Sequence, residues 1–149
     1  MVIQRVSRAE VRVDGERVAA IGRGLLLLVG LERGDGEAQL GRAARKVAGL
    51  RVFDDGAGRL HRSLEEVGGA VLAVSQFTLA GSLRRGRRPS FDRAMPAEAA
   101  RPLFERFVEL LRAHGIAVET GVFRAEMEVE LVNDGPVTLL WDDPPGSGG

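Results

Sequence analysis

A run of five apolar residues at positions 25–29 constrains the fold more than any other feature of this chain. A strand with no polar position has no face to turn toward water, so the run predicts a strand that is buried on both faces of a sheet. The run is far too short to span a bilayer, which takes about 20 residues. Residues 1–5 also lack the apolar stretch of a signal peptide. We therefore expect a soluble, cytoplasmic protein with no membrane partner.

Several shorter segments also predict strands, mainly because apolar and polar residues alternate along them. Asp14-Gly15 separates two of these segments and is a strong signal for a tight β-hairpin. A turn is expected at 54–58, after a very short strand. The expected strands cover residues 2–6, 11–13, 18–21, 52–53, 70–79, 116–119, 126–132 and 137–141.

Two longer segments have the spacing of apolar residues that is typical of amphipathic helices. In the first, 35–50, Asp35 is placed to cap the N-terminus. The second, 96–114, has Pro96 at a first-turn position and is closed by Gly115. The apolar faces carry Leu40, Ala44, Val47 and Leu50 in the first helix, and Leu103, Phe107, Leu110 and Leu111 in the second.

The order of these elements indicates an α+β fold, because strands lead, helices are few, and strand and helix do not alternate regularly. We expect a curved, barrel-like, mostly antiparallel or mixed sheet with two main helices packed on it. The length of 149 residues suits one domain, which we place at residues 1–142. Residues 143–149 are rich in proline, glycine and serine, and we expect a disordered tail there.

The composition excludes several kinds of site. There is no cysteine, which rules out disulfides and thiolate chemistry. His61 and His114 belong to no metal-binding pattern, and no glycine-rich phosphate loop is present. We therefore expect no metal and no cofactor. The formal net charge is zero, so any contact with nucleic acid has to come from a local basic patch.

Ser75, Gln76, Phe77 and Thr78 end an apolar strand, where two hydroxyls and an amide are unusual for a core. They either bond to the backbone at a corner of the sheet or belong to a functional site, since sites often lie where strands meet loops. Backbone N–H groups released at such a strand end can bind a developing oxyanion. The residues alone leave both interpretations open.

Asn133-Asp134-Gly135-Pro136-Val137-Thr138 lies between two apolar segments. The simplest interpretation is a turn in which Pro136 opens the last strand, a position that the sheet ladder permits. Gly135-Pro136 is also a place where a cis peptide bond can occur.

Arg84, Arg85, Arg87 and Arg88 form a dense basic cluster in a glycine-containing loop at 80–89. Such a run is either a solvated stretch of charge or a site that holds phosphate. The absence of any acid within the cluster is compatible with both interpretations.

Together these segments resemble the D-aminoacyl-tRNA deacylase (D-tyrosyl-tRNA deacylase) family, from Val2 to about Asp142. The resemblance also includes Gln4-Arg5-Val6, Arg88-Pro89-Ser90-Phe91 and Thr120-Gly121. It implies a deacylase domain that cleaves the ester of D-aminoacyl-tRNA, and of glycine mischarged on tRNA, into free tRNA and amino acid. It implies a homodimer that acts on the acceptor end of tRNA.

The resemblance also assigns roles to residues. It implies that Gly135-Pro136 is cis, reaches into the partner's active site and meets the α-amino group of the substrate with two carbonyl oxygens. Arg5 matches an arginine that steadies this pair, and Asn133, Val137 and Thr138 belong to the same substrate-binding segment. Ser75 to Thr78 would line the catalytic pocket beneath the ester, with Met127 nearby. Arg84, Arg85, Arg87 and Arg88 are the expected tRNA contacts.

This scheme is physically reasonable, because D and L isomers carry the same groups and only shape can separate them. A rigid backbone obstacle would exclude the L side chain and admit glycine. An aminoacyl ester is already activated and needs only positioning and backbone donors, with the family thought to use the 2′-hydroxyl of the terminal ribose. Thr78 has no evident base beside it, so we expect it to position the substrate. Arg124, Glu126 and His61 depart from the family pattern.

Two other functions remain open from the residues. One is a serine or threonine hydrolase of a small ester, in which His61 activates Ser75 or Thr78. The other is a non-catalytic module that binds tRNA through the arginine cluster.

Overall fold

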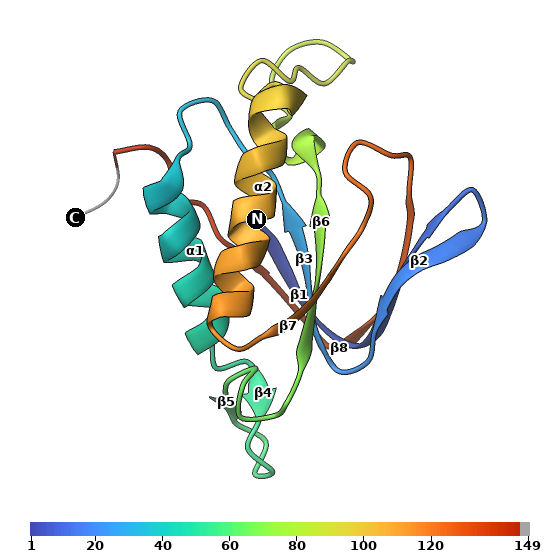
Figure 1. Ribbon diagram of the computed structural model, residues 1–149, viewed down its shortest axis with the longest axis vertical. Helices are drawn as coiled ribbons and strands as arrows, with labels where there is room; N and C mark the ends of the chain where they lie inside the picture. Colours follow the sequence, from blue (N-terminus) through green and yellow to red (C-terminus); the bar gives the residue numbers. More distant parts are fainter. Residues whose placement is uncertain (147–149) are drawn as a thin grey trace.

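The computed structural model describes residues 1–146, and its main element is a six-stranded mixed sheet (Figure 1). The strand order is β2-β1-β3-β6-β7, with β8 also paired to β1. The strands of this sheet are β1 (Val2–Val13), β2 (Glu16–Ile21), β3 (Gly24–Val29), β6 (Ala70–Ser75), β7 (Ala117–Thr120) and β8 (Glu128–Leu140). The expected α+β fold with a curved, barrel-like sheet is confirmed.

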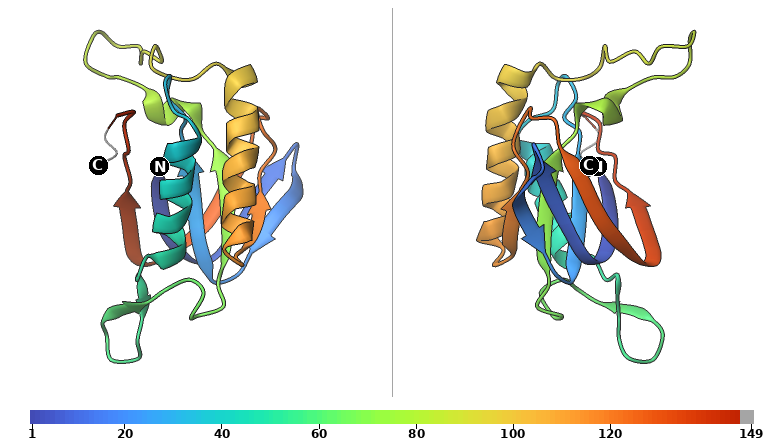
Figure 2. Two further views of the ribbon diagram at one scale, coloured as in Figure 1. Left: turned by 60° about the vertical axis from the view of Figure 1, so that its left-hand side comes forward. Right: turned by 90° about the vertical axis from the view of Figure 1, so that its right-hand side faces the viewer.

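Two helices lie side by side on one face of this sheet (Figure 2). They are α1 (Glu37–Gly49) and α2 (Ala97–Ala113), and a 3-10 helix, η1 (Phe77–Ala80), follows β6. A small hairpin of β4 (Phe53–Asp54) and β5 (Leu60–Arg62) projects from one end of the molecule. None of the helices within residues 1–146 has the length and apolar character needed to cross a membrane.

The curvature of the sheet comes from β1, which is long enough to pair with three strands. Its first half pairs with β3 and its second half with β2, while β8 runs along its other edge through nearly the whole length. Because β2 and β3 follow each other on the same edge of β1, the sheet bends between them and curls toward a barrel. At the outer end, Asp14 and Gly15 have φ values of 52° and 79°. Positive φ at both central residues is typical of a type I′ hairpin turn, which confirms the expected hairpin.

The expected burial of residues 25–29 on both faces is also confirmed. Leu25, Leu27 and Val29 face a core that the two helices cover. Leu26 faces the opposite way, into a second core inside the barrel. Its neighbours in that second core include Val6, Val11, Leu72 and Val74.

Three local expectations are wrong. Strand β6 ends at Ser75 rather than at residue 79, because the chain turns into η1. The N-cap of α1 is Gly36 and not Asp35, whose carboxylate accepts a hydrogen bond from the Glu32 N–H at 2.8 Å. The Gly36 N–H is bonded by the Gln39 side chain instead, at 3.0 Å. Pro96 is the N-cap of α2 rather than its first-turn residue.

The expected turn at residues 133–138 is wrong as well, because β8 continues through it as one strand. Gln4 pairs with Thr138 and Val6 pairs with Asn133, so one residue of β1 faces four residues of β8. Residues 134–137 therefore bulge out of the ladder opposite Arg5. We call this segment the β8 bulge.

Residues 143–149 were expected to form a disordered tail, and residues 147–149 lie outside the described part of the chain. Before them, the Asp143 carboxylate accepts a hydrogen bond from Arg42 Nε at 2.7 Å. The assignment of residues 1–142 to one domain stays a prediction.

Gly24 offers a test of how tightly β3 and β6 pack. A Cβ at this position would lie 1.8 Å from the carbonyl oxygen of Ala70, which is backbone and cannot move aside cheaply. We expect Gly24→Ala to lower the free energy of unfolding by about 2–3 kcal/mol or more, because the two strands must separate. Urea denaturation measures this. The control is Gly22→Ala, which meets nothing within 4 Å and should change stability by less than about 1 kcal/mol. Equal effects of the two substitutions would contradict the described packing.

Candidate functional site

The segment from Ser75 to Thr78 forms the end of a buried strand and the start of η1. The Gln76 N–H donates to the carbonyl oxygen of Val29 at 2.8 Å, which extends the pairing of β6 with β3 by one residue. The chain then turns, and the side chains of Phe77 and Thr78 become exposed. Gln76 Nε2 donates to Thr78 Oγ1 at 3.0 Å. The Thr78 hydroxyl and the Gln76 amide therefore bond to each other at the surface, while the corner of the sheet is held by a backbone hydrogen bond.

The β8 bulge is held from inside by Arg5, whose side chain is only 12% exposed. Its Nη1 donates to the carbonyl oxygen of Val52 at 2.7 Å, and its Nε donates to that of Asp134 at 3.0 Å. A Cβ on Gly135 would lie 3.0 Å from Arg5 Nη2, so the arginine also packs against the bulge. The Gly135-Pro136 peptide bond is cis, which confirms that expectation.

A second set of hydrogen bonds closes the bulge at its two ends. Asn133 Nδ2 donates to Thr138 Oγ1 at 2.8 Å, and Asn133 Oδ1 accepts from the Val137 N–H at 3.2 Å. Gln4 Nε2 also donates to Thr138 Oγ1, at 3.3 Å. The exposed tip, Gly135-Pro136, is thus supported by side chains on both sides and is presented outward.

Within one chain the two motifs lie apart. The pairing of β3 places Arg5 opposite Leu25 and Ser75 opposite Val29. This offset of four residues corresponds to about 13 Å along the strand, at about 3.3 Å per residue. The structure therefore brings Arg5 and Asn133 to Thr138 together, and Ser75 to Thr78 together, but it does not join the two groups.

Met127 borders the end of β6. A Cβ on Gly121 would lie 2.7 Å from the sulfur of Met127 and 3.7 Å from Val74 Cγ2. Met127 therefore packs near Val74, the last buried residue of that strand. Gly121 itself donates its N–H to the carbonyl oxygen of Ala73 at 3.2 Å. Arg124 turns away from this region, and its guanidinium lies 3.8 Å from the Glu98 carboxylate on α2.

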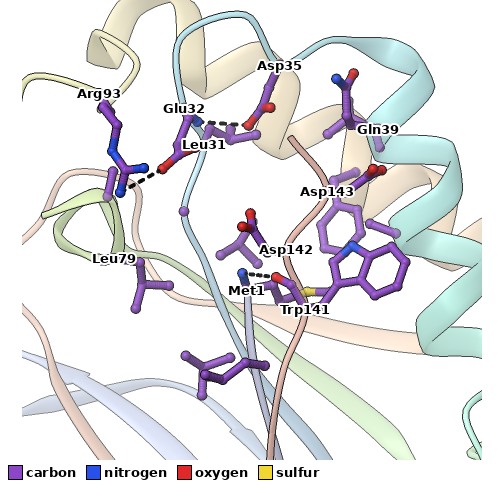
Figure 3. Close-up of a pocket in the computed structure, with 18 residues that line it drawn as sticks. Met1, Leu31, Glu32, Asp35, Gln39, Leu79, Arg93, Trp141, Asp142 and Asp143 are labelled. Atoms are coloured by element: carbon purple, nitrogen blue, oxygen red, sulfur yellow. Dashed lines mark hydrogen bonds and ion pairs between the residues drawn. The ribbon is translucent and has the colours of Figure 1, made fainter. Parts of the chain in front are cut away.

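A cavity of about 260 Å³ lies next to η1, between α1 and the ends of β1 and β8 (Figure 3). Leu79 and Ala80 line it, but no residue from Ser75 to Thr78 does. Its polar groups are mainly acidic, and burial raises the pKa of the Asp35 carboxyl. Carboxylates repel phosphate, so this cavity does not suit a polyanion. The acids that line it are Glu32, Asp35, Asp142 and Asp143.

The histidine needed by the serine or threonine hydrolase interpretation is in the wrong place. His61 lies on β5, at the opposite end of the molecule from η1 (Figure 1). Among residues 1–146, the side-chain partner of Thr78 Oγ1 is an amide and not a base. No group of three or more histidine or acidic side chains in this part of the chain could hold a metal ion.

Sequence reasoning missed two contributors to this geometry. The carbonyl oxygen of Val52 holds Arg5, and a backbone carbonyl leaves no signal in the sequence. The ring of Phe91 meets that of Phe77 edge to face, with 5.3 Å between ring centroids. Phe91 belongs to the Arg88-Pro89-Ser90-Phe91 segment of the resemblance, but no pattern along the chain predicts that its ring meets the ring of Phe77.

Known proteins of one family are similar to this chain over almost its whole length. A family model described as D-Tyr-tRNA(Tyr) deacylase matches residues 2–142. A D-aminoacyl-tRNA deacylase of Symbiobacterium thermophilum is 63% identical over 141 residues, which cover 95% of this chain and 93% of the relative. A protein of the same name from Geobacter sulfurreducens is 57% identical, with the same coverage.

Two solved structures have the same fold. The c-Myc DNA unwinding element binding protein superposes with a TM-score of 0.89 at 40% identity, covering 96% of this chain and 97% of that one. A structure described as a probable eukaryotic D-amino acid tRNA deacylase superposes with a TM-score of 0.80, covering 95% and 97%. Its 19% identity bears on the fold alone.

Proposed function

Because this chain belongs to the D-Tyr-tRNA(Tyr) deacylase family, we propose that it is an editing hydrolase that cleaves the ester between a D-amino acid and tRNA. The products are free tRNA and the amino acid. The observation that carries this conclusion is 63% identity, over 95% of the chain, to a protein named D-aminoacyl-tRNA deacylase. Since aminoacyl-tRNA is made and used in the cytoplasm, the proposal places the enzyme there.

Selection of the D isomer is assigned to the β8 bulge. The two isomers carry the same groups, so an enzyme separates them only by excluding one shape. Exclusion needs an obstacle that does not yield, and backbone fastened at several points meets that need better than a flexible side chain. The bonds from Arg5 and Asn133 described above support this role for Gly135-Pro136. Glycine has no side chain to collide, so glycine mischarged on tRNA is also a substrate.

The proposal includes a homodimer in which each bulge serves the other subunit's pocket. The offset between the two motifs along β3 supports this, because one chain alone does not present both to one substrate. The surface of β8 gives further support, since Leu139 is 39% and Leu140 81% exposed. Among the described strands β8 pairs with β1 alone, and an apolar edge strand is normally covered.

Hydrolysis is assigned to positioning and backbone donors near Ser75 to Thr78. The first N–H groups of a 3-10 helix have no acceptor within the helix, so those of Phe77 and Thr78 are available to a developing oxyanion. The acceptor end of tRNA would enter here, with its terminal ester above the Ser75 and Gln76 side chains. An activated ester held in this way needs no protein nucleophile.

The isomer preference is tested with purified protein and tRNA charged with D-tyrosine, L-tyrosine or glycine. We expect the D ester to be cleaved at least about 100-fold faster than the L ester, which corresponds to about 2.7 kcal/mol in the transition state. Glycyl-tRNA should be cleaved as well. Release of labelled amino acid measures each rate. Equal cleavage of the D and L esters, or of neither, would refute the proposed function.

The role of Thr78 is tested with Thr78→Ala. Its hydroxyl accepts one neutral hydrogen bond from Gln76, and losing such a contact costs about 1 kcal/mol. We therefore expect kcat/KM for D-tyrosyl-tRNA to fall by no more than about tenfold. Loss of a true nucleophile would reduce the rate by several orders of magnitude. Isolation of an acyl group on Thr78 by mass spectrometry would show that the positioning role is wrong.

The shared site is tested by mixing two defective variants. Gly135→Val disrupts the bulge, because an added side chain meets Arg5 and Val137, and Ser75→Trp places a bulky side chain at the other motif. Each should fold and be inactive alone, because in this proposal the carbonyl oxygens of the bulge also bind the α-amino group of the substrate. After co-refolding at equal amounts, we expect about a quarter of the wild-type activity, since half of the dimers contain one intact site of two. If the mixture is no more active than the separate variants, each site belongs to a single chain.

A further inference from the structure

The arginine cluster belongs to a closed loop that begins directly after η1. Ser82 and Ser90 form an antiparallel bridge, with N–O distances of 2.7 and 2.9 Å in its two hydrogen bonds. The bridge brings the two ends of residues 83–89 together. We call these seven residues the arginine loop, and Figure 2 shows it projecting from the end of the molecule where η1 lies.

The base of the arginine loop is attached to the segment that the proposed function assigns to catalysis. The ring of Phe91, directly after the bridge, packs edge to face on that of Phe77. A Cβ on Gly81 would lie 3.0 Å from the Phe91 ring, so the chain leaves η1 in close contact with that ring. The loop is therefore held next to Thr78.

The four arginines of the loop carry charge that no neighbour neutralises. Within residues 1–146, none of them forms an ion pair, whereas the exposed Arg8, Arg59 and Arg106 each bond to a carboxylate. The whole chain has no net charge, so this loop is a local positive patch. Like charges at this density repel one another, and a polyanion relieves that repulsion.

Beside the patch lies an open groove of about 630 Å³. Arg84, Arg85 and Arg93 line it together with Ser82, Ser90 and the single acid Asp92. Leu83 also lines the groove and is 80% exposed, while Phe77, which packs on Phe91 next to Ser90, is 57% exposed. A basic groove with exposed apolar and aromatic side chains is typical of sites for single-stranded nucleic acid, where phosphates meet arginine and unpaired bases meet flat apolar surface. In a duplex the faces of the bases are stacked and cannot meet such a surface.

We infer that the arginine loop binds the phosphates of the unpaired nucleotides that precede the terminal, aminoacylated one. This inference rests on the proposed function. Contacts of this loop with phosphate carry no information about base sequence.

The test compares two fourfold variants with the same change in net charge. The loop variant replaces all four arginines of the loop by alanine. The control variant replaces four exposed arginines elsewhere, Arg17, Arg45, Arg51 and Arg59. Both are assayed on D-tyrosyl-tRNA and on D-tyrosyl-adenosine, which has no phosphate, between 50 and 200 mM salt.

For single-stranded RNA each phosphate contact contributes about 0.7 to the slope of log affinity against log salt. For tRNA, we expect the slope of log kcat/KM against log salt to be smaller in magnitude by about 3 in the loop variant. Between 50 and 200 mM salt, kcat/KM of the wild-type enzyme should therefore fall by a factor about 50 times larger than that of the loop variant. At 50 mM salt the loop variant should lose far more activity on tRNA than on the adenosine ester. The control variant should keep the wild-type slope.

Equal losses in the two variants, or an unchanged slope in the loop variant, would overturn the inference. A second measurement uses fluorescence anisotropy to compare the binding of a five-nucleotide RNA ending in CCA with that of a blunt RNA duplex. If the loop variant loses the same affinity for both RNAs, relative to the wild type, the inference is also overturned. Failure of the proposed function is a separate result, because wild-type enzyme would then leave D-tyrosyl-adenosine intact. The binding measurement still tests the loop in that case.

Discussion

The fold depends on the burial of β3 on both faces. One face requires the cover of α1 and α2, and the other requires the sheet to curl until strands β1, β2 and β6 enclose it. The same curl makes β1 long and leaves β8 as the outer strand on its free edge. The two candidate motifs are therefore positioned by the covering of one apolar strand: one ends β6, beside β3, and the other bulges from β8.

Each motif is rigid for a different reason. The end of β6 is fixed because the strand is buried and its pairing continues to Gln76. The β8 bulge has no neighbouring strand on its outer side and gains its rigidity from Arg5 and Asn133. A deacylase that sorts isomers by shape requires both kinds of rigidity, since the ester must be held still while the wrong side chain is turned away.

Local pattern was sufficient for most of the fold. The apolar run, the Asp14-Gly15 turn and the two helices all depend on residues close together in the chain, and each was predicted. The continuity of β8 was not predicted, because its register is set by pairing with β1, whose paired residues lie 116 to 138 positions away in the sequence. Asp35 failed as a cap because its carboxylate bonds backwards to Glu32. The site residues were identified by resemblance, whereas the carbonyl of Val52 that holds Arg5 had no sequence signal.

The partners of Arg5 have a consequence for how such a protein changes over time. Both acceptors, on Val52 and Asp134, are main-chain oxygens, and every amino acid supplies one. The two hydrogen bonds therefore do not depend on which side chains stand at positions 52 and 134, although Val52 is buried in the core and the Asp134 carboxylate lies 3.8 Å from Arg5 Nε. Lysine in place of Arg5 would have a single ammonium to offer two divergent oxygens. Among the groups that form these two hydrogen bonds, the side chain of Arg5 is therefore the one that a substitution can remove.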